Sequence, residues 1–215
     1  MNKGYPRILL LLATWLFSTL LPAQTRGLSG LTVGLNLNRI QEHRDWDWTG
    51  GYRKDISAGL LSISPLGNGM SLQTELLFSQ RGHEITRNGV SMGTERLHTR
   101  LTYLELPCML RLGPIGNKTF SPALLLGGYA SYRLKARQRI NDGGFTSIQE
   151  EVRRWDLGLT AGVSLGFPTG AGQMVLLDAR YIHGLSNIHT QAPNTSAPVP
   201  SWYNRGFTVS CGLTF

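Results

Sequence analysis

Residues 207–215 read FTVSCGLTF and end the chain on a strict alternation of apolar with small or polar side chains. A period of two predicts a β-strand with one apolar face and one polar face. The ends of soluble domains usually fray, so a strand that keeps this pattern up to a final aromatic residue indicates that its apolar face meets lipid. The apolar face of this strand comprises Phe207, Val209, Cys211, Leu213 and Phe215.

The opposite end of the chain has the order of a secretory signal peptide. Two cations precede the apolar run 8–21, and a short stretch suited to cleavage follows at 21–23. The run is shorter than the roughly 20 residues that a helix needs to cross a bilayer. We therefore predict a signal peptide at residues 1–23, followed by a single domain at 24–215. A retained amino-terminal anchor is the alternative.

Eight segments of the domain are predicted strands. They lie near residues 31–38, 56–64, 70–80, 98–112, 120–134, 155–167, 173–183 and 203–215. Between them, the links 65–69, 113–119 and 168–172 are short and rich in turn-forming residues, whereas 39–55, 81–97, 135–153 and 184–202 are long and polar. Short turns on one side and long loops on the other are typical of outer-membrane β-barrels.

The predicted fold class is therefore all-β: an eight-stranded antiparallel transmembrane β-barrel with short periplasmic turns and four long outer loops. Closure is expected because hydrocarbon offers no partner for the backbone groups of an open sheet edge. The clearest strand, from Trp155 to Phe167, would rise roughly 28–32 Å along the membrane normal at the usual tilt, close to the apolar band of such barrels. A soluble barrel or sandwich with a buried apolar face is the structural alternative.

Seven charged residues fall on the expected inward faces of these strands. One is Arg133, and the other six are the candidates for a lumen cluster: Glu75, Glu105, Arg111, Asp156, Asp178 and Arg180. Because side chains fill most of the interior of an eight-stranded barrel, we predict that these residues form a structural ionic cluster in the lumen. A conducting or proton-relaying lumen is the alternative.

The net charge of +8 would be compatible with a nucleic-acid partner. We predict none, because the chain shows neither a basic helix nor a stacking module. The cations lie mainly in or beside the expected outer loops, which predicts either a solvated surface or attraction to the phosphates of outer-leaflet glycolipid and to anionic glycans. Cys108 and Cys211 occupy expected lipid-facing positions on separate strands, so we predict two free thiols. Their spacing fits no metal site, and no cofactor is predicted.

Catalysis is not predicted. His183, Ser186 and Asn187 resemble the residue types of outer-membrane lipid hydrolases, but a serine nucleophile needs a histidine base within hydrogen-bond reach, and the spacing differs from the His-x-Ser pattern of lipid A deacylases. A lipid-modifying enzyme stays a minor alternative. Trp202 and Tyr203 are expected to anchor the barrel at the membrane interface. For Trp46 and Trp48, in the first outer loop, ligand binding and anchoring are equally favoured.

Four segments carry a resemblance to a known family: 59–61 GLL, 72–82 LQTELLFSQRG, 103–107 YLELP and 180–188 RYIHGLSNI. With them the chain resembles the small outer-membrane β-barrel domain proteins of Bacteroidota, a group that includes the PorT-like proteins. The resemblance implies lumen positions for Glu75 and Glu105. It also implies that Pro107 interrupts a strand ladder, at a bulge.

The resemblance further implies that the outer-membrane insertion machinery recognises the terminal strand ending at Phe215. We therefore expect an integral protein of a Gram-negative outer membrane, exported by the general secretory route, with a structural or surface-interaction role carried by its outer loops. Outer-membrane lipids and glycolipid are the other expected partners. An accessory role in protein secretion or envelope assembly, with proteins of those systems as partners, is the alternative.

Overall fold

The structure is a computed structural model that describes residues 27–42, 49–89, 93–114, 119–141, 143–170, 172–190 and 201–215. The expected signal peptide, Trp46 and Trp48 lie outside this range. Within it, no helix has the length and apolar character needed to cross a membrane. Ten strands are present: β1 Leu28–Glu42, β2 Thr49–Gly51, β3 Arg53–Gly67, β4 Met70–Gly89, β5 Gly93–Leu112, β6 Ser121–Ile140, β7 Thr146–Ser147, β8 Trp155–Gly170, β9 Gln173–Gly184 and β10 Trp202–Thr214.

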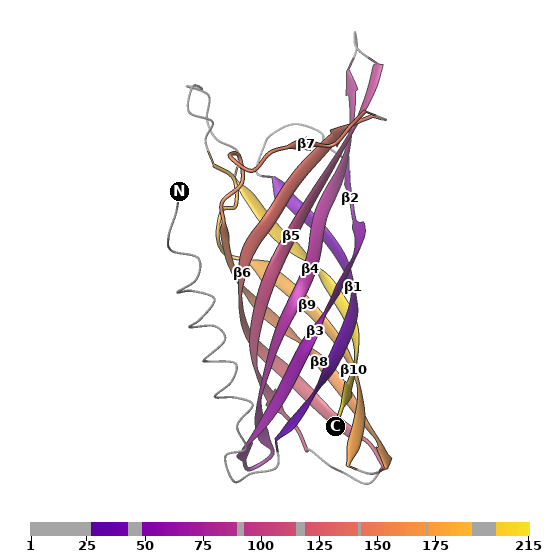
Figure 1. Ribbon diagram of the computed structural model, residues 1–215, viewed down its shortest axis with the longest axis vertical. Helices are drawn as coiled ribbons and strands as arrows, with labels where there is room; N and C mark the ends of the chain where they lie inside the picture. Colours follow the sequence, from indigo (N-terminus) through magenta and orange to yellow (C-terminus); the bar gives the residue numbers. More distant parts are fainter. Residues whose placement is uncertain are drawn as a thin grey trace.

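Eight long strands of the described chain close into one antiparallel barrel (Figure 1). Strand β10 pairs with β1 from Thr214↔Gly30 to Trp202↔Glu42, and the pairing of β4 with β5 completes the cylinder. The backbone N–H of Phe215 adds a last bond to the Ser29 carbonyl at 2.8 Å. Strands β2 and β7 are short additions that pair with β4 and β6. The predicted all-β, eight-stranded barrel is confirmed.

The outer wall of the barrel is apolar. Along β8, the side chains of Trp155, Leu157, Leu159, Val163 and Phe167 are exposed, whereas the alternating Asp156, Thr160 and Ser164 are buried. A monomer with so much contiguous exposed apolar surface requires an apolar surrounding. This arrangement excludes the soluble alternative, in which the apolar face would point inward. Cys108 and Cys211 lie on the outer wall as free thiols, as predicted.

Several strands continue far beyond their predicted ends. The segment 81–97, expected to be a loop, belongs almost entirely to the hairpin of β4 and β5, which rises above the rest of the barrel in Figure 1. Likewise, β1, β3 and β6 extend into the expected loops at 39–55 and 135–153. The prediction was wrong because alternation marks only the part of a strand that separates lipid from lumen; a ladder in water needs no apolar face.

Two irregularities interrupt the ladders of β5. Opposite Pro107, the β4–β5 pairing lapses between Thr74↔Cys108 and Leu77↔Glu105 without a change of offset. The ladder is therefore interrupted there as expected, because proline lacks an N–H, but the expected bulge is absent at that residue. The β5–β6 register instead shifts between Thr102 and Tyr103, which face Lys135 and Arg133 and leave Leu134 as the extra residue.

Candidate functional site

The interior of the barrel is packed in layers, beginning with an apolar one at the short-turn end. Leu61 and Ile63 of β3 contact Met174 and Leu176 of β9 in a buried cluster, and Leu28 packs against them. On β9 the inward Met174 and Leu176 alternate with the outward Val175 and Leu177, so this end of β9 is apolar on both faces. The cluster closes the lumen at the short-turn end.

The next layer is an ion pair that spans the lumen between β4 and β9. Arg180 Nη1 lies 2.9 Å from each carboxylate oxygen of Glu75. Gln73 extends the pair, because its Nε2 donates to Glu75 Oε1 at 2.8 Å and to Asp178 Oδ2 at 2.9 Å. All four side chains are buried. One amide thus connects two carboxylates on opposite walls.

The same layer reaches the third wall through Arg111 of β5. Its Nη1 donates to Ser164 Oγ at 2.5 Å, and this hydroxyl donates to Asp178 Oδ1 at 2.5 Å. The guanidinium also contacts the Ser121 carbonyl, with Nη2 at 3.4 Å. Because hydrogen bonds in a low-dielectric interior reinforce one another, this network helps to fix the relative positions of β4, β5, β8 and β9.

A second ionic layer surrounds Arg81 of β4, further from the short-turn end. Arg81 forms an ion pair with Glu105, and its Nη1 lies 3.6 Å from Asp156 Oδ2. The guanidinium carbon lies 4.7 Å from the ring centroid of Tyr129 and 5.9 Å from that of Tyr103. Two carboxylates and two aromatic faces therefore surround this cation, which compensates for its removal from water.

Asp156 is the centre of this layer. Its Oδ2 accepts hydrogen bonds from Asn204 Nδ2 at 2.8 Å and from Tyr129 Oη at 3.2 Å. Its Oδ1 accepts one from Ser186 Oγ at 2.8 Å. The donors come from β10, β6 and the segment after β9, so a single carboxylate joins the wall to the outer end of the barrel.

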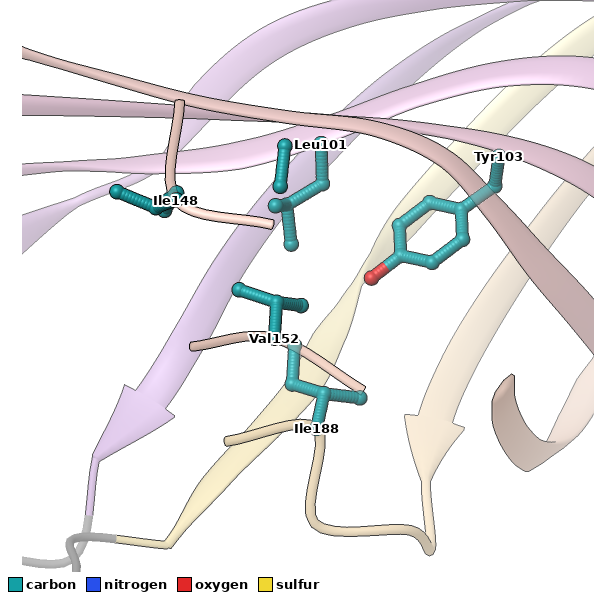
Figure 2. Packing of buried hydrophobic residues seen from close by; sticks show 6 residues of the cluster. Leu101, Tyr103, Ile148, Val152 and Ile188 are labelled. Carbon is teal, nitrogen blue, oxygen red and sulfur yellow. The ribbon is translucent and has the colours of Figure 1, made fainter. Parts of the chain in front are cut away.

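The outer end is closed by chain that folds into the lumen, residues 148–153 and 187–190, here called the outer cap. Figure 2 shows Ile148, Val152 and Ile188 of the cap directed toward Leu101 and Tyr103 on the inner wall of β5. Ala136 of β6 completes this buried cluster, and Trp202 packs against it. The cap brings apolar side chains into what would otherwise be an open, polar entrance.

Hydrogen bonds hold the outer cap in place. Val152 and His189 form a β-bridge, and Arg153 N donates to Ile188 O at 2.7 Å. From the wall, Arg133 Nη2 donates to the Gln149 carbonyl at 2.8 Å. The His189 ring lies 4.4 Å from the Trp202 ring, and partial burial, with the Arg153 guanidinium nearby, lowers the pKa of His189. The cap is thus a fixed part of the fold.

Charges balance inside the described barrel. The buried charged side chains are the carboxylates of Asp55, Glu75, Glu105, Asp156 and Asp178 and the guanidinium groups of Arg81, Arg111, Arg133 and Arg180. The half-buried Arg53 adds a fifth cation, paired with Asp55 at 3.0 Å. An interior cavity beside Glu105 and Arg180 measures only about 10 Å³, close to the space that one water occupies. Side chains therefore fill the described part of the barrel interior.

A family model described as "Outer membrane protein beta-barrel domain" matches residues 23–190 of the sequence. The chain belongs to this family. It is therefore an outer-membrane β-barrel protein, and the short turns of its barrel face the periplasm. A search of curated proteins found no match.

Solved structures of outer-membrane proteins are similar to this chain. The outer membrane protein OprG from Pseudomonas aeruginosa is similar at a TM-score of 0.52 and 11% identity, over 87% of this chain and 93% of that one. Neisserial surface protein A is similar at 0.48 and 10% identity, over 87% and 97%. Ail, the attachment invasion locus protein of Yersinia pestis, is similar at 0.42 and 14% identity, over 88% and 99%. The likeness to OprG concerns the fold.

The structure places all six of the expected lumen charges inside this outer-membrane β-barrel. It divides them between the two ionic layers: Glu75, Arg111, Asp178 and Arg180 lie in one, and Glu105 and Asp156 lie in the other. The terminal set Phe207, Val209, Cys211, Leu213 and Phe215 lies on the outer wall. Its role as an insertion signal stays a prediction.

Sequence reasoning missed Arg81, Gln73, Tyr129 and Asn204 as members of the network. Arg81 was assigned to a loop, although it continues the inward series Ser71, Gln73, Glu75, Leu77 and Ser79 on β4. That series was the available signal. For Gln73 and Asn204 the position on an inward face was also readable, but the contact across the lumen was not.

The residues considered for catalysis have structural contacts. Ser186 Oγ donates to Asp156, and Asn187 Oδ1 accepts hydrogen bonds from the backbone of His189 at 3.0 Å and of Trp202 at 2.9 Å. His183 lies beside Tyr181, with ring centroids 6.3 Å apart. Tyr181 faces outward, and so does His183 at the same parity. Ser186 is thus hydrogen-bonded to Asp156 inside the barrel, whereas His183 faces the outside of the wall.

The prediction that Trp202 anchors the barrel in the interface was wrong. Its ring packs on the buried cluster of the outer cap and makes edge contacts with His83 at 5.8 Å. Trp202 lies two residues before the inward-facing Asn204, so its side chain also points toward the lumen. There the apolar residues of the outer cap shield its ring from water. Aromatic contacts on the outer wall come instead from Tyr132 with Trp155 and from Tyr181 with Phe207.

Proposed function

We propose that this outer-membrane β-barrel is a non-enzymatic surface protein whose specific interactions are made on its outer side. The filled lumen carries the proposal: an apolar cluster at the periplasmic end, two ionic layers and the outer cap follow one another along the axis. The cavity between the ionic layers of the described barrel measures only about 10 Å³, which is too small for a substrate. Specific interaction is therefore expected on outer segments or on the outer wall.

The proposal includes the route by which the protein reaches its membrane. A signal peptide at residues 1–23 would direct it through the general secretory route, and the insertion machinery would recognise the terminal strand. Lipids and glycolipid of the outer membrane would then surround the apolar wall. The order of charges and apolar residues in 1–23 and the outward parity of the last strand support this.

Electrical recording tests the filled lumen. We expect the purified barrel, inserted in a planar bilayer, to show no sustained ohmic conductance, because apolar clusters and buried ion pairs fill the described part of the lumen. A refolded sample must first show heat-modifiable gel migration, which reports an intact barrel. A stable, reproducible conductance from such a sample would contradict the proposal.

A second role is proposed from the resemblance to the PorT-like proteins of Bacteroidota, which rests on segments such as 72–82 and 180–188. In this role the protein would assist secretion or envelope assembly. We then expect secretion or envelope proteins to copurify reproducibly with the native barrel from outer membranes. A pull-down that recovers only lipid and the insertion machinery would count against this role and leave the surface role in place.

A further inference from the structure

A groove of about 520 Å³ lies on the outer wall of the barrel, across β4, β5 and β6. Phe78 and Leu134 form its apolar side, and both are about half exposed. Arg100, Lys135 and Arg137 form its polar side. None of the residues that line the groove is acidic. The groove therefore joins lipid-facing surface to a patch of positive charge.

The register shift in β5–β6 creates this combination. Up to Arg133, odd-numbered residues of β6 face the lumen; past the extra residue Leu134, the parity is reversed and Ala136 is buried. Both Leu134 and Lys135 consequently point outward, as does Arg137. Without the bulge, Lys135 and Arg137 would face the lumen. Bulges commonly redirect side chains at functional sites.

The cations are held close together on adjacent strands. Arg100 and Arg137 are direct cross-strand partners, and Thr102 faces Lys135 one step nearer the membrane. Like charges placed directly opposite each other destabilise a sheet. An anion seated between them would remove this repulsion, so the pair fits a bound anionic group better than an empty surface.

Phe145 fixes the outer edge of the groove. Its ring lies 5.6 Å from the guanidinium carbon of Arg100 and 5.2 Å from that of Arg139. Cation–π contacts of this kind orient a guanidinium without neutralising its charge. The aromatic residue thus positions Arg100 over the groove while its donors stay available.

The level of the groove identifies the occupant. At the groove, the outward-facing residues change from apolar to cationic: from Leu104 to Arg100 on β5, and from Leu134 to Lys135 and Arg137 on β6. The cations therefore lie directly beyond the apolar wall. A ligand that fills both sides needs acyl chains on the membrane side and an anion above them, which is the chemistry of a phosphorylated glycolipid.

We propose that this groove is a specific binding site for the phosphorylated headgroup of an outer-leaflet glycolipid. Arg100, Lys135 and Arg137 bind the phosphate, and Phe78 and Leu134 contact the proximal part of an acyl chain. The site requires residence in the outer membrane, but it does not depend on the surface role proposed above. A protein with no specific role would still hold this lipid.

The test compares two triple variants of the full barrel in detergent micelles. R100Q/K135Q/R137Q removes the groove cations, and R39Q/K54Q/R205Q removes three outward-facing cations of β1, β3 and β10. The probe is bisphosphorylated lipid A, with its dephosphorylated form as comparison. We expect roughly fivefold weaker binding per cation lost, about a hundredfold for the groove variant, and a much smaller change for the other. Heat-modifiable migration verifies that both variants are folded.

Phe145→Ala provides a second test at constant charge. We expect it to weaken lipid A binding several-fold, because Arg100 loses its support, while binding of the dephosphorylated form stays unchanged. Equal losses in the two triple variants, or equal affinity of the parent protein for both lipid forms, would overturn the proposal. So would displacement of lipid A by inorganic phosphate at equal concentration, because the apolar side of the groove would then contribute nothing.

Discussion

Replacing Glu75 with glutamine is expected to destabilise the folded barrel by about 3–5 kcal/mol, because the change removes the direct ion-pair partner of the buried Arg180. Both oxygens of the Glu75 carboxylate accept from Arg180 Nη1. The other contacts of this guanidinium are weak: Ser210 Oγ at 3.4 Å and Met109 Sδ at 3.6 Å. Reversible urea unfolding of the barrel in micelles, followed by tryptophan fluorescence, measures the effect.

The same strand supplies a matched control. Glu84 is also on β4, but its side chain is 45% exposed and lies 3.6 Å from His98, so Glu84→Gln should change the free energy of unfolding by less than about 1 kcal/mol. The double variant Glu75→Met/Arg180→Met should recover most of the loss, because it removes both charges. A small effect of Glu75→Gln alone would show that the network does not stabilise the barrel.

Deletion of Phe215 is expected to reduce the amount of assembled barrel in the outer membrane several-fold. The deletion removes the last bond to Ser29, at 2.8 Å, and a side chain that is 66% exposed at the periplasmic edge. Aromatic residues are favoured at that interface, and, under the proposed recognition of the terminal strand, the insertion machinery would lose an aromatic contact. The heat-modifiable fraction in outer-membrane preparations measures the effect.

Two further variants test whether assembly depends on an aromatic ring at position 215 in particular. Phe215→Tyr keeps an amphipathic aromatic ring and should assemble normally. Phe145→Ala removes an exposed aromatic side chain from an outer segment and should also assemble normally. Full assembly of the Phe215 deletion would mean that the alternation of β10 alone suffices for insertion.

The membrane-embedded fold could be predicted from the sequence because each strand there has lipid on one face and the lumen on the other. Lipid on one side and a polar lumen on the other force the alternation seen in Leu157, Gly158 and Leu159. Beyond the bilayer this constraint ends, and the outer parts of β4, β5 and β6 carried no comparable signal. Their pairing depends on a hairpin that continues in water, where both faces can be polar.

The contacts that complete the interior were less predictable. Parity placed Glu75 and Arg180 on inward faces, but their pairing depends on the stagger of strands 105 residues apart in sequence. The inward turn of Ile148, Val152 and Ile188 depends on the cluster that they form together. No alternation precedes these residues. The bulge at Leu134 was also hidden, because one additional residue in a long strand leaves both halves of the pattern intact.

The positions of the two cysteines bear on how the barrel is closed. Cys108 on β5 and Cys211 on β10 face outward, and β6, β8 and β9 separate the two strands in the sheet. A disulfide needs Cα atoms within about 7 Å of each other, so these thiols cannot join within one barrel. Strand pairing, without a disulfide between these two residues, closes the cylinder. The two residues also supply native attachment points for lipid-soluble thiol reagents, which could report from within the bilayer without any engineered cysteine.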